Sequence, residues 1–247
     1  MFEVFLRAGM RRLPVVLFAA AVPLLLICAS VTWAVNEIRL YEHGFDTYDV
    51  PLVTGIERED LVVAAKEIRG YFNSTREPLD VRTRIFGEER DLFNHREVLH
   101  MHDVKRLIWG VYGVGAAAAL YLLAFLCLGL RLRGRAVGPQ VTRGVVWGAG
   151  LTVGVVVLVG LLSVTGFDSL FLFFHEVSFS NDFWMLDPRR DFLVMMFPQG
   201  FWFDATMFVA FVTVGLAVLL LGSVAAVRLL GRWQERRRER PTAQHPA

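Results

Sequence analysis

The amino-acid sequence predicts an all-α membrane protein with four transmembrane helices and an extracytoplasmic cap that contains an amphipathic helix. Three observations support this fold class. Of the 247 residues, 55% are hydrophobic and the mean hydropathy is +0.46, which is too apolar for an ordinary soluble domain. Four uncharged segments are each long enough to cross a bilayer. The charged residues between these segments are distributed unequally by sign.

The first uncharged segment, residues 13–35, follows a short basic stretch, residues 1–12. At about 1.5 Å per residue, a helix of this length crosses the roughly 30 Å of hydrocarbon in a bilayer. Its apolar core is longer than the about 7–15 residues of a signal-peptide core, so we expect a retained helix. Pro23 lies inside it, where proline can kink a helix.

Residues 36–106 form the largest polar region and the expected cap. Thr54-Gly-Ile-Glu57 matches a capping box, in which the two polar side chains satisfy free backbone N–H groups at a helix start. The helix that follows should end near Gly70, and its spacing places four apolar residues on one face: Leu61, Ala65, Ile68 and Phe72.

The rest of the cap is expected to be less regular at first and then helical. Residues 73–87 mix charges with Pro78 and predict a loop or a short strand, with weak alternation over residues 81–86. Residues 91–106 return to a helical pattern and should continue into the second membrane span.

The remaining segments are assigned by the same criteria. They are a second span at 107–130, a basic connector at 131–143, a third span at 144–167, an aromatic extracytoplasmic loop at 168–204, a fourth span at 205–227 and a basic tail at 228–247. Two glycine spacings in the third span, Gly144 with Gly148 and Gly150 with Gly154, would allow another helix to approach closely.

The distribution of charge predicts the orientation. The two termini and the connector hold thirteen Lys and Arg against three Asp and Glu, whereas the cap and the aromatic loop hold thirteen basic and twenty-one acidic residues. Positive residues favour the cytoplasmic side, so both termini should be cytoplasmic in a multi-pass protein. The run from Arg236 to Arg238 is then a topology and anionic-lipid signal rather than a nucleic-acid patch.

The two cysteines, Cys28 and Cys127, lie in apolar segments near opposite membrane faces. We therefore expect no disulfide between them and interpret both as small packing residues.

The candidate reactive groups are histidines at the outer membrane boundary. His100 lies within about two turns of the second span, and His175 follows the third span among many aromatic residues. Asp103, three residues after His100, shares its helix face and can orient or charge-stabilise that imidazole. His95 and His102 fall on a different face, and His43 and His245 lie in a flexible-looking segment and in the tail.

Three interpretations of this pair remain open. The imidazoles can act as general base and general acid in acyl transfer near neutral pH. With Asp103 they can bind zinc. They can also simply form hydrogen bonds at helix ends. A covalent acyl-enzyme is poorly supported, because no G-x-S-x-G motif is present and neither cysteine can reach the outer site.

Two stretches resemble a known family. Phe93-Asn-His-Arg-Glu97 and Leu99-His-Met-His-Asp-Val-Lys105 are similar to the motif that enters the second span in the lipoprotein intramolecular transacylases (Lit), a family of bacterial membrane enzymes. The second Lit motif resembles residues in the aromatic stretch: Phe174-His175, Phe179-Ser-Asn181-Asp-Phe-Trp184, Asp187-Pro188, Asp191 and Phe197-Pro198.

The resemblance implies four membrane helices under an extracellular cap, and an enzyme that moves an acyl chain within one diacylglyceryl lipoprotein. The sn-2 chain would pass to the α-amino group of the lipidated N-terminal cysteine, which leaves a lyso-form lipoprotein. The catalytic histidines map onto His100 and His175. Five more residues are candidates for oxyanion binding, substrate binding or orientation: Asp103, Arg96, Asn181, Trp184 and Asp191.

We therefore expect a monomer in the bacterial cytoplasmic membrane, with its active site at the outer face. The expected partners are the diacylglyceryl lipoprotein substrate and membrane lipid, with no nucleic acid, no metal and no cofactor. Two alternatives are a metal-dependent membrane lipid hydrolase that uses His100, Asp103 and His175, and a non-catalytic membrane scaffold.

Overall fold

The computed structural model describes residues 2–238, and the side chains of residues 13–234. The end of the basic tail, which includes His245, lies outside the described residues. The helices are α1 (Phe2–Asn36), α2 (Ile38–Thr47), α3 (Val50–Thr54), α4 (Arg58–Phe72), α5 (His95–Arg133), the 3-10 turn η1 (Gly134–Val137), α6 (Gly138–Ser178), α7 (Phe192–Met196) and α8 (Gln199–Arg238). The strands are β1 (Arg82–Ile85) and β2 (Glu88–Asp91).

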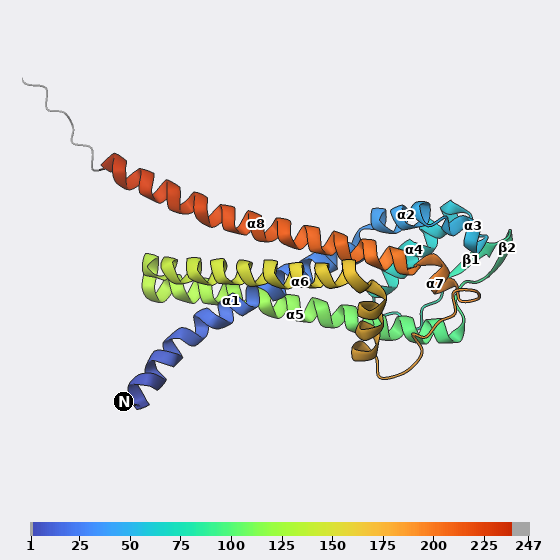
Figure 1. Cartoon of the computed structure of the whole chain (residues 1–247), viewed down its shortest axis with the longest axis horizontal. Helices are drawn as coiled ribbons and strands as arrows, with labels where there is room; N and C mark the ends of the chain where they lie inside the picture. Colours follow the sequence, from blue (N-terminus) through green and yellow to red (C-terminus); the bar gives the residue numbers. More distant parts are fainter. Residues whose placement is uncertain (1, 239–247) are drawn as a thin grey trace, which may run out of the picture.

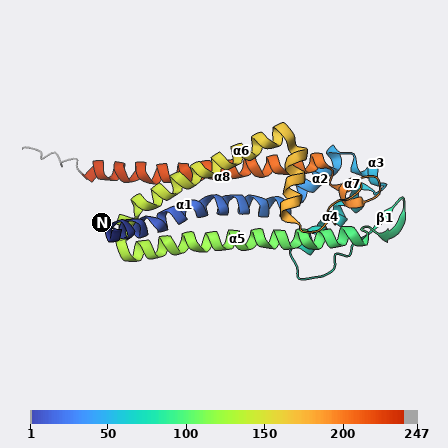
Figure 2. The same ribbon diagram turned by 60° about the horizontal axis from the view of Figure 1, so that its bottom comes forward.

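Four long helices, α1, α5, α6 and α8, form an elongated bundle that carries the smaller elements at one end (Figures 1 and 2). Helix α1 contacts the other three, and α6 also contacts α8. Within the described residues, three segments are long and apolar enough to cross a membrane: Leu13–Asn36, His95–Ser178 and Gln199–Gln234. The second of these contains both α5 and α6, which η1 joins. Helix α1 packs against both of them and lies between them in Figure 2.

Small residues let α1 and α6 approach closely. A Cβ atom added at Gly148 would lie 2.6 Å from Cβ of Val22 and 2.8 Å from the carbonyl oxygen of Ala19, so no larger residue fits without movement. The ring of Phe18 covers Gly144 in the same way. The close approach expected at this glycine pair is confirmed. The second pair, Gly150 and Gly154, has nothing within 4 Å and takes no part in helix packing.

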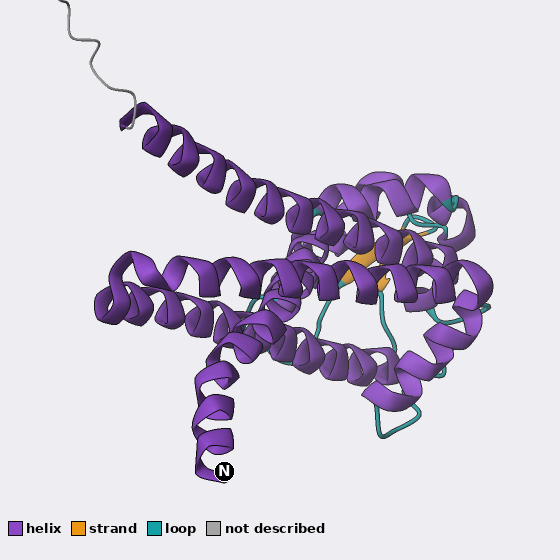
Figure 3. Cartoon of the chain, turned by 60° about the vertical axis from the view of Figure 1, so that its left-hand side comes forward, coloured by secondary structure: helices purple, strands orange, loops and turns teal. Residues whose placement is uncertain are grey.

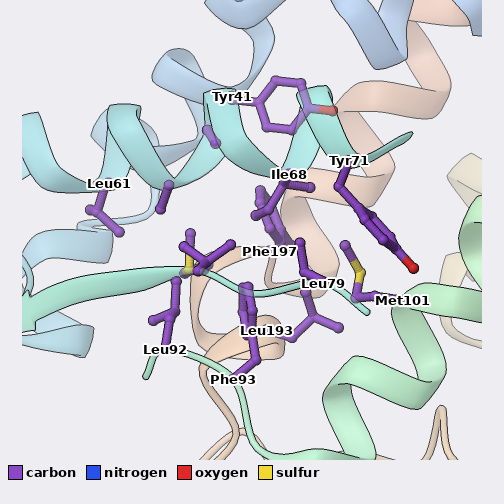
Figure 4. Close-up of a cluster of buried hydrophobic side chains, with 14 of the residues drawn as sticks. Tyr41, Leu61, Ile68, Tyr71, Leu79, Leu92, Phe93, Met101, Leu193 and Phe197 are labelled. Carbon is purple, nitrogen blue, oxygen red and sulfur yellow. The ribbon is translucent and has the colours of Figure 1, made fainter. Parts of the chain in front are cut away.

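The cap consists of α2, α3, α4, the β1–β2 hairpin and α7, which surround one apolar core. Figure 4 shows the buried side chains of this core. The amphipathic helix is confirmed as α4, because the four residues predicted for its apolar face are all buried: Leu61, Ala65, Ile68 and Phe72. Strand β1 pairs antiparallel with β2, with Arg82 opposite Asp91. Elsewhere in the described chain the architecture is helical (Figure 3).

Two local predictions for the cap are wrong. Thr54 does not start a helix; it ends α3, where its hydroxyl donates to the Val50 carbonyl at 2.7 Å and accepts from the Ile56 N–H. Glu57 precedes α4 without a side-chain cap, so the expected capping box is not formed. His43, placed in a flexible-looking segment, lies instead within the regular helix α2.

The two cysteines differ in environment. Both are free, as expected, but only Cys28 is buried, whereas Cys127 is exposed on the surface of the bundle. The packing role predicted for both is therefore confirmed for Cys28 alone.

Helix α6 extends beyond the predicted end of the third span. At Gly166 its backbone leaves the helical conformation, with φ −174° and ψ 63°. Beyond this residue α6 turns across the bundle toward α5 and ends at Ser178 (Figures 1 and 2). The first part of the aromatic stretch is thus helical rather than loop, and residues 179–191 connect it to α7. The bend brings His175 over α5.

Candidate active site

Two imidazoles from distant parts of the chain lie together where the bundle meets the cap. His100 projects from the second turn of α5 and His175 from the bent end of α6. Their ring centroids are 6.1 Å apart, and the rings are inclined by 33°. His100 is 7% exposed and His175 is 8% exposed, so both are nearly enclosed. The juxtaposition expected from the sequence is confirmed, although 74 residues separate the two histidines along the chain.

The position of His100 depends on how α5 begins. The Asn94 side-chain oxygen accepts hydrogen bonds from the backbone N–H groups of Arg96 and Glu97. In return, Oε2 of Glu97 accepts the Asn94 N–H at 2.7 Å, which completes a capping box. The other oxygen, Oε1, accepts the N–H of Leu193 in α7 at 2.7 Å.

Glu97 was missed as a site residue, although the Asn-x-x-Glu spacing is a recognisable start signal for a helix. Its carboxylate is 1% exposed and serves two backbone segments at once. It fixes the first turn of α5, and therefore the helix position from which His100 projects.

His175 is held in one tautomer. Its Nδ1 lies 2.8 Å from the Phe171 carbonyl oxygen, and a carbonyl can only accept, so Nδ1 carries the proton. In the neutral ring, Nε2 is then left with a free lone pair. Four aromatic rings surround the imidazole, with centroid distances of 4.3 Å for Phe171, 5.1 Å for Trp184, 5.4 Å for Phe174 and 5.6 Å for Phe179.

His100 is held by packing instead of hydrogen bonds. Its ring meets the edge of Phe179 at 5.2 Å, and its Nδ1 is buried without a hydrogen-bond partner among the described residues. A buried polar atom without a partner is uncommon in native proteins and is often found where a ligand binds or a reaction occurs. The site therefore holds one imidazole with a fixed proton and one whose nitrogen is unused.

Residues 179–191 cover the histidines and are tied to α5. The Asn181 side chain donates to Oδ2 of Asp103 at 2.8 Å, and the Arg96 guanidinium donates to the backbone carbonyl of Asp182. Asp103 makes no hydrogen bond to His100, so the orienting contact expected between them is not formed. Its charge still acts electrostatically on the imidazole. Arg96 and Asp103 thus position the covering segment.

Asp191 anchors the other end of this segment. It is 5% exposed, and its two oxygens accept from the Asn94 side chain at 2.9 Å and from the Asp187 N–H at 2.7 Å. Two of the residues predicted to assist the histidines hold a donor without a hydrogen-bond partner among the described residues. These are Trp184, whose indole ring lies 5.1 Å from that of His175, and Arg96, whose Nε is buried.

His102 belongs to a different cluster, on another face of α5. Its Nδ1 lies 3.3 Å from Glu77, whose carboxylate also accepts hydrogen bonds from Lys105 at 2.9 Å and Tyr71 at 2.7 Å. Desolvation raises the pKa of Glu77, but the hydrogen bonds from Tyr71, Lys105 and His102 outweigh it and lower this pKa to about 2. His102 and His100 therefore face different parts of the molecule, as predicted.

Within the part of the chain that the structure describes, no three His, Cys, Asp or Glu side chains gather into a set that could hold a metal ion. The zinc set offered by the sequence, His100 with Asp103 and His175, is therefore not assembled among the described residues, and Oδ2 of Asp103 accepts a hydrogen bond from Asn181.

Comparison with known proteins gives consistent matches. The family model described as "Lipoprotein intramolecular transacylase Lit" matches residues 16–202. An uncharacterized protein of Aquifex aeolicus (strain VF5) is 28% identical over 145 residues, which is 57% of this chain and 61% of that relative. The alignment thus spans less than two thirds of the relative's length.

The same fold is found in solved structures. The membrane-integral lipoprotein intramolecular transacylase Lit from Bacillus cereus superposes with a TM-score of 0.77 at 17% sequence identity, over 92% of this chain and 99% of that one. A structure of the same bacterial protein with one histidine mutated to alanine gives a TM-score of 0.75 at 17% identity, over 94% and 99% of the two chains.

Proposed function

Because the chain belongs to the Lit family of lipoprotein intramolecular transacylases, we propose that it moves the sn-2 acyl chain of a diacylglyceryl lipoprotein onto the α-amino group of its N-terminal cysteine. The product is a lyso-form lipoprotein that carries an N-acyl group. The observation that carries this proposal is the meeting of His100 and His175, 6.1 Å apart in an aromatic enclosure.

In this proposal α1, α5, α6 and α8 each cross the bacterial membrane, and the cap with both histidines lies outside the cytoplasm. The positive residues at the termini and in the connector support this orientation. The reacting ester and amine of a lipoprotein lie at the outer boundary of the membrane. The bent end of α6 turns toward α5 beside the cap (Figure 2), and the proposed orientation assigns it to this boundary.

The two histidines divide the proton transfers. At neutral pH an imidazole is mostly uncharged, so both rings can start neutral. His100 takes the first proton from the cysteine ammonium group. As the amine nitrogen bonds to the acyl carbon, it loses a second proton to Nε2 of His175. Nε2 is the acceptor because Nδ1 already carries a proton, which it donates to the Phe171 carbonyl.

Collapse of the tetrahedral intermediate breaks the bond between the acyl carbon and the glycerol oxygen. His100 returns its proton to that oxygen, which leaves as a hydroxyl group. His175 then releases its proton to water, so both rings are neutral again. We assign the oxyanion to the indole N–H of Trp184, because it has no hydrogen-bond partner among the described residues and its ring lies 5.1 Å from that of His175.

The enclosure contributes by holding the reacting groups together. The attack closes a medium ring of N, Cα, Cβ, S, two glycerol carbons, O and the acyl carbon, which a flexible lipid rarely adopts. Positioning of this kind can contribute up to about 7–11 kcal/mol to a reaction. Residues 179–191, tied to α5 through Asn181 and Asp191, supply the wall of this enclosure.

The test is expression in a bacterium that makes only diacyl lipoproteins, followed by tandem mass spectrometry of their N-terminal lipopeptides. The acyl shift leaves the mass unchanged, so fragmentation must locate the chain on the amide. We expect N-acyl product with the wild type and with His102→Gln. His100→Gln and His175→Gln should each lower it by roughly 100- to 10,000-fold.

The other outcomes separate the alternatives. Loss of one chain as free fatty acid would indicate a lipid hydrolase. Wild-type levels of product with folded His100→Gln or His175→Gln would refute a role for these rings in proton transfer. Absence of product from the wild type would favour a non-catalytic membrane scaffold.

A further inference from the structure

A second site lies at the end of the bundle opposite the cap. There a pocket of about 320 Å³ is formed between the start of α6 and the far part of α8, which diverge toward this end (Figures 1 and 3). Its lining comes from one face of α6 and from a single residue of α8: Pro139, Thr142, Arg143, Val146, Trp147 and Arg228.

Two arginines face this pocket from different helices. Neither Arg143 nor Arg228 makes a hydrogen bond or an ion pair with any residue whose side chain the structure describes. The sequence has no Asp or Glu between residues 107 and 167, so α6 has no carboxylate near Arg143. Two guanidinium groups that share a pocket repel each other unless an anion lies between them. Arginine binds phosphate well, because its planar fork donates two parallel hydrogen bonds.

The same pocket has an apolar side. Val146 is 47% exposed and Trp147 is 70% exposed, directly beside the arginines. On α8, Val227 is 70% exposed next to Arg228. Tryptophan beside arginine is typical of the boundary between lipid headgroups and acyl chains. A ligand that satisfies all these groups has a negative phosphate at one end and hydrocarbon at the other.

We propose that this pocket binds an anionic phospholipid of the leaflet on the connector side. Arg143 and Arg228 hold its phosphate, and its acyl chains lie along the exposed apolar faces of α6 and α8. A free phosphate ion could use the same two arginines, but it would leave the apolar half of the pocket without a contact. The pocket lies at the opposite end of the bundle from the histidines, and its proposed function is independent of the acyl transfer.

The first test compares binding of phosphatidylglycerol and phosphatidylcholine to the purified protein by native mass spectrometry. We expect the wild type to retain phosphatidylglycerol preferentially, and Arg143→Gln/Arg228→Gln to weaken this by about tenfold or more. The matched control is Arg131→Gln/Arg135→Gln, which removes the same charge from the same end of the bundle but outside the pocket. It should bind as the wild type does.

Three results would overturn the proposal. Equal weakening in both double variants would mean general surface attraction, and equal retention of phosphatidylcholine would mean apolar adhesion only. Displacement of phosphatidylglycerol by inorganic phosphate would assign the site to a soluble anion.

A second measurement needs no arginine variant, so it remains valid if the arginine variants fold poorly. Brominated acyl chains quench tryptophan fluorescence on contact. In mixed bilayers, the fluorescence attributable to Trp147, taken as wild type minus Trp147→Phe, should be quenched more by brominated phosphatidylglycerol than by brominated phosphatidylcholine at the same fraction. Equal quenching by the two lipids would contradict a selective site.

Discussion

At the scale of single residues, Glu97 does more for the site than its position in the sequence indicates. Its two oxygens accept backbone N–H groups from the start of α5 and from α7, and the side chain is 1% exposed. One carboxylate therefore holds the helix that carries His100 against the end of the segment that covers it. The side chain does not touch the imidazoles, so its effect on the reaction is one of position.

We predict that Glu97→Gln destabilises the protein, because an amide has one oxygen and leaves one of the two buried N–H groups without an acceptor. An unpaired buried donor costs about 1–3 kcal/mol. The measurement is the thermal unfolding midpoint in detergent, with the exposed Glu67→Gln on α4 as the control. Unchanged midpoints for both variants would show that this carboxylate does not hold the two segments together.

Glu77 makes the cap sensitive to acid. Its pKa is about 2 in the folded protein, against an ordinary value of 4.5, so the carboxylate stabilises the fold fully above about pH 4.5. As the pH falls from there toward about 2, this contribution is lost. We predict that the unfolding midpoint of the wild type falls more steeply over this range than that of Glu77→Gln, which has no proton to gain. Parallel pH profiles would contradict the prediction.

The sequence allowed some site residues to be predicted and not others. His100 and His175 were found because each lies close to a predicted span and because their motifs resemble a known family. The hydrogen bond from Asn181 to Asp103 was not predicted, because it depends on the course of residues 179–191, which carry no periodic pattern. The anchoring role of Asp191 was not predicted either, because its partner Asn94 is distant in the sequence.

At the scale of elements, the bend in α6 decides whether the site exists. A straight helix would carry residues 167–178 along the bundle axis, whereas the bend at Gly166 turns them toward α5 (Figure 2). Glycine disfavours continuous helix relative to alanine by about 1 kcal/mol, and kinks commonly occur at such residues.

We predict that Gly166→Ala lowers transacylase activity several-fold by favouring a straighter helix, without lowering the unfolding midpoint. A methyl group meets no atom within 4 Å at either Gly166 or Gly160, so crowding is excluded at both. Gly160→Ala, in the regular part of the same helix, is the matched control and should keep full activity. Full activity in both variants would show that the bend does not depend on this glycine.

Elements were predicted well where one face is apolar and poorly where none is. The long apolar segments follow from their uncharged length, and α4 follows from its periodicity. Strand β2 was missed because all four of its residues, Glu88–Asp91, are exposed and show no alternation. The end of α6 was placed too early because aromatic residues after Asp168 were interpreted as a boundary loop, when they continue the helix beyond its bend.

At the scale of the whole molecule, the charge distribution predicts that the cap and the connector lie on opposite sides of the membrane. We predict that His95→Cys, introduced into a Cys28→Ala/Cys127→Ala background, reacts with a membrane-impermeant maleimide once the cytoplasmic membrane is accessible from outside. Arg135→Cys, in the connector, should react only after the membrane is permeabilised. The reverse pattern would invert the orientation and place the histidines on the cytoplasmic side.

The proposed function requires that the acyl chain moves within one lipoprotein molecule, with His100 and His175 transferring the protons. The most direct measurement uses the purified protein in lipid with a mixture of two synthetic diacylglyceryl lipopeptides, one labelled with heavy isotopes in both its sn-2 chain and its peptide, the other unlabelled. We predict N-acyl products that carry both labels or neither. Products that carry one label without the other would contradict an intramolecular transfer.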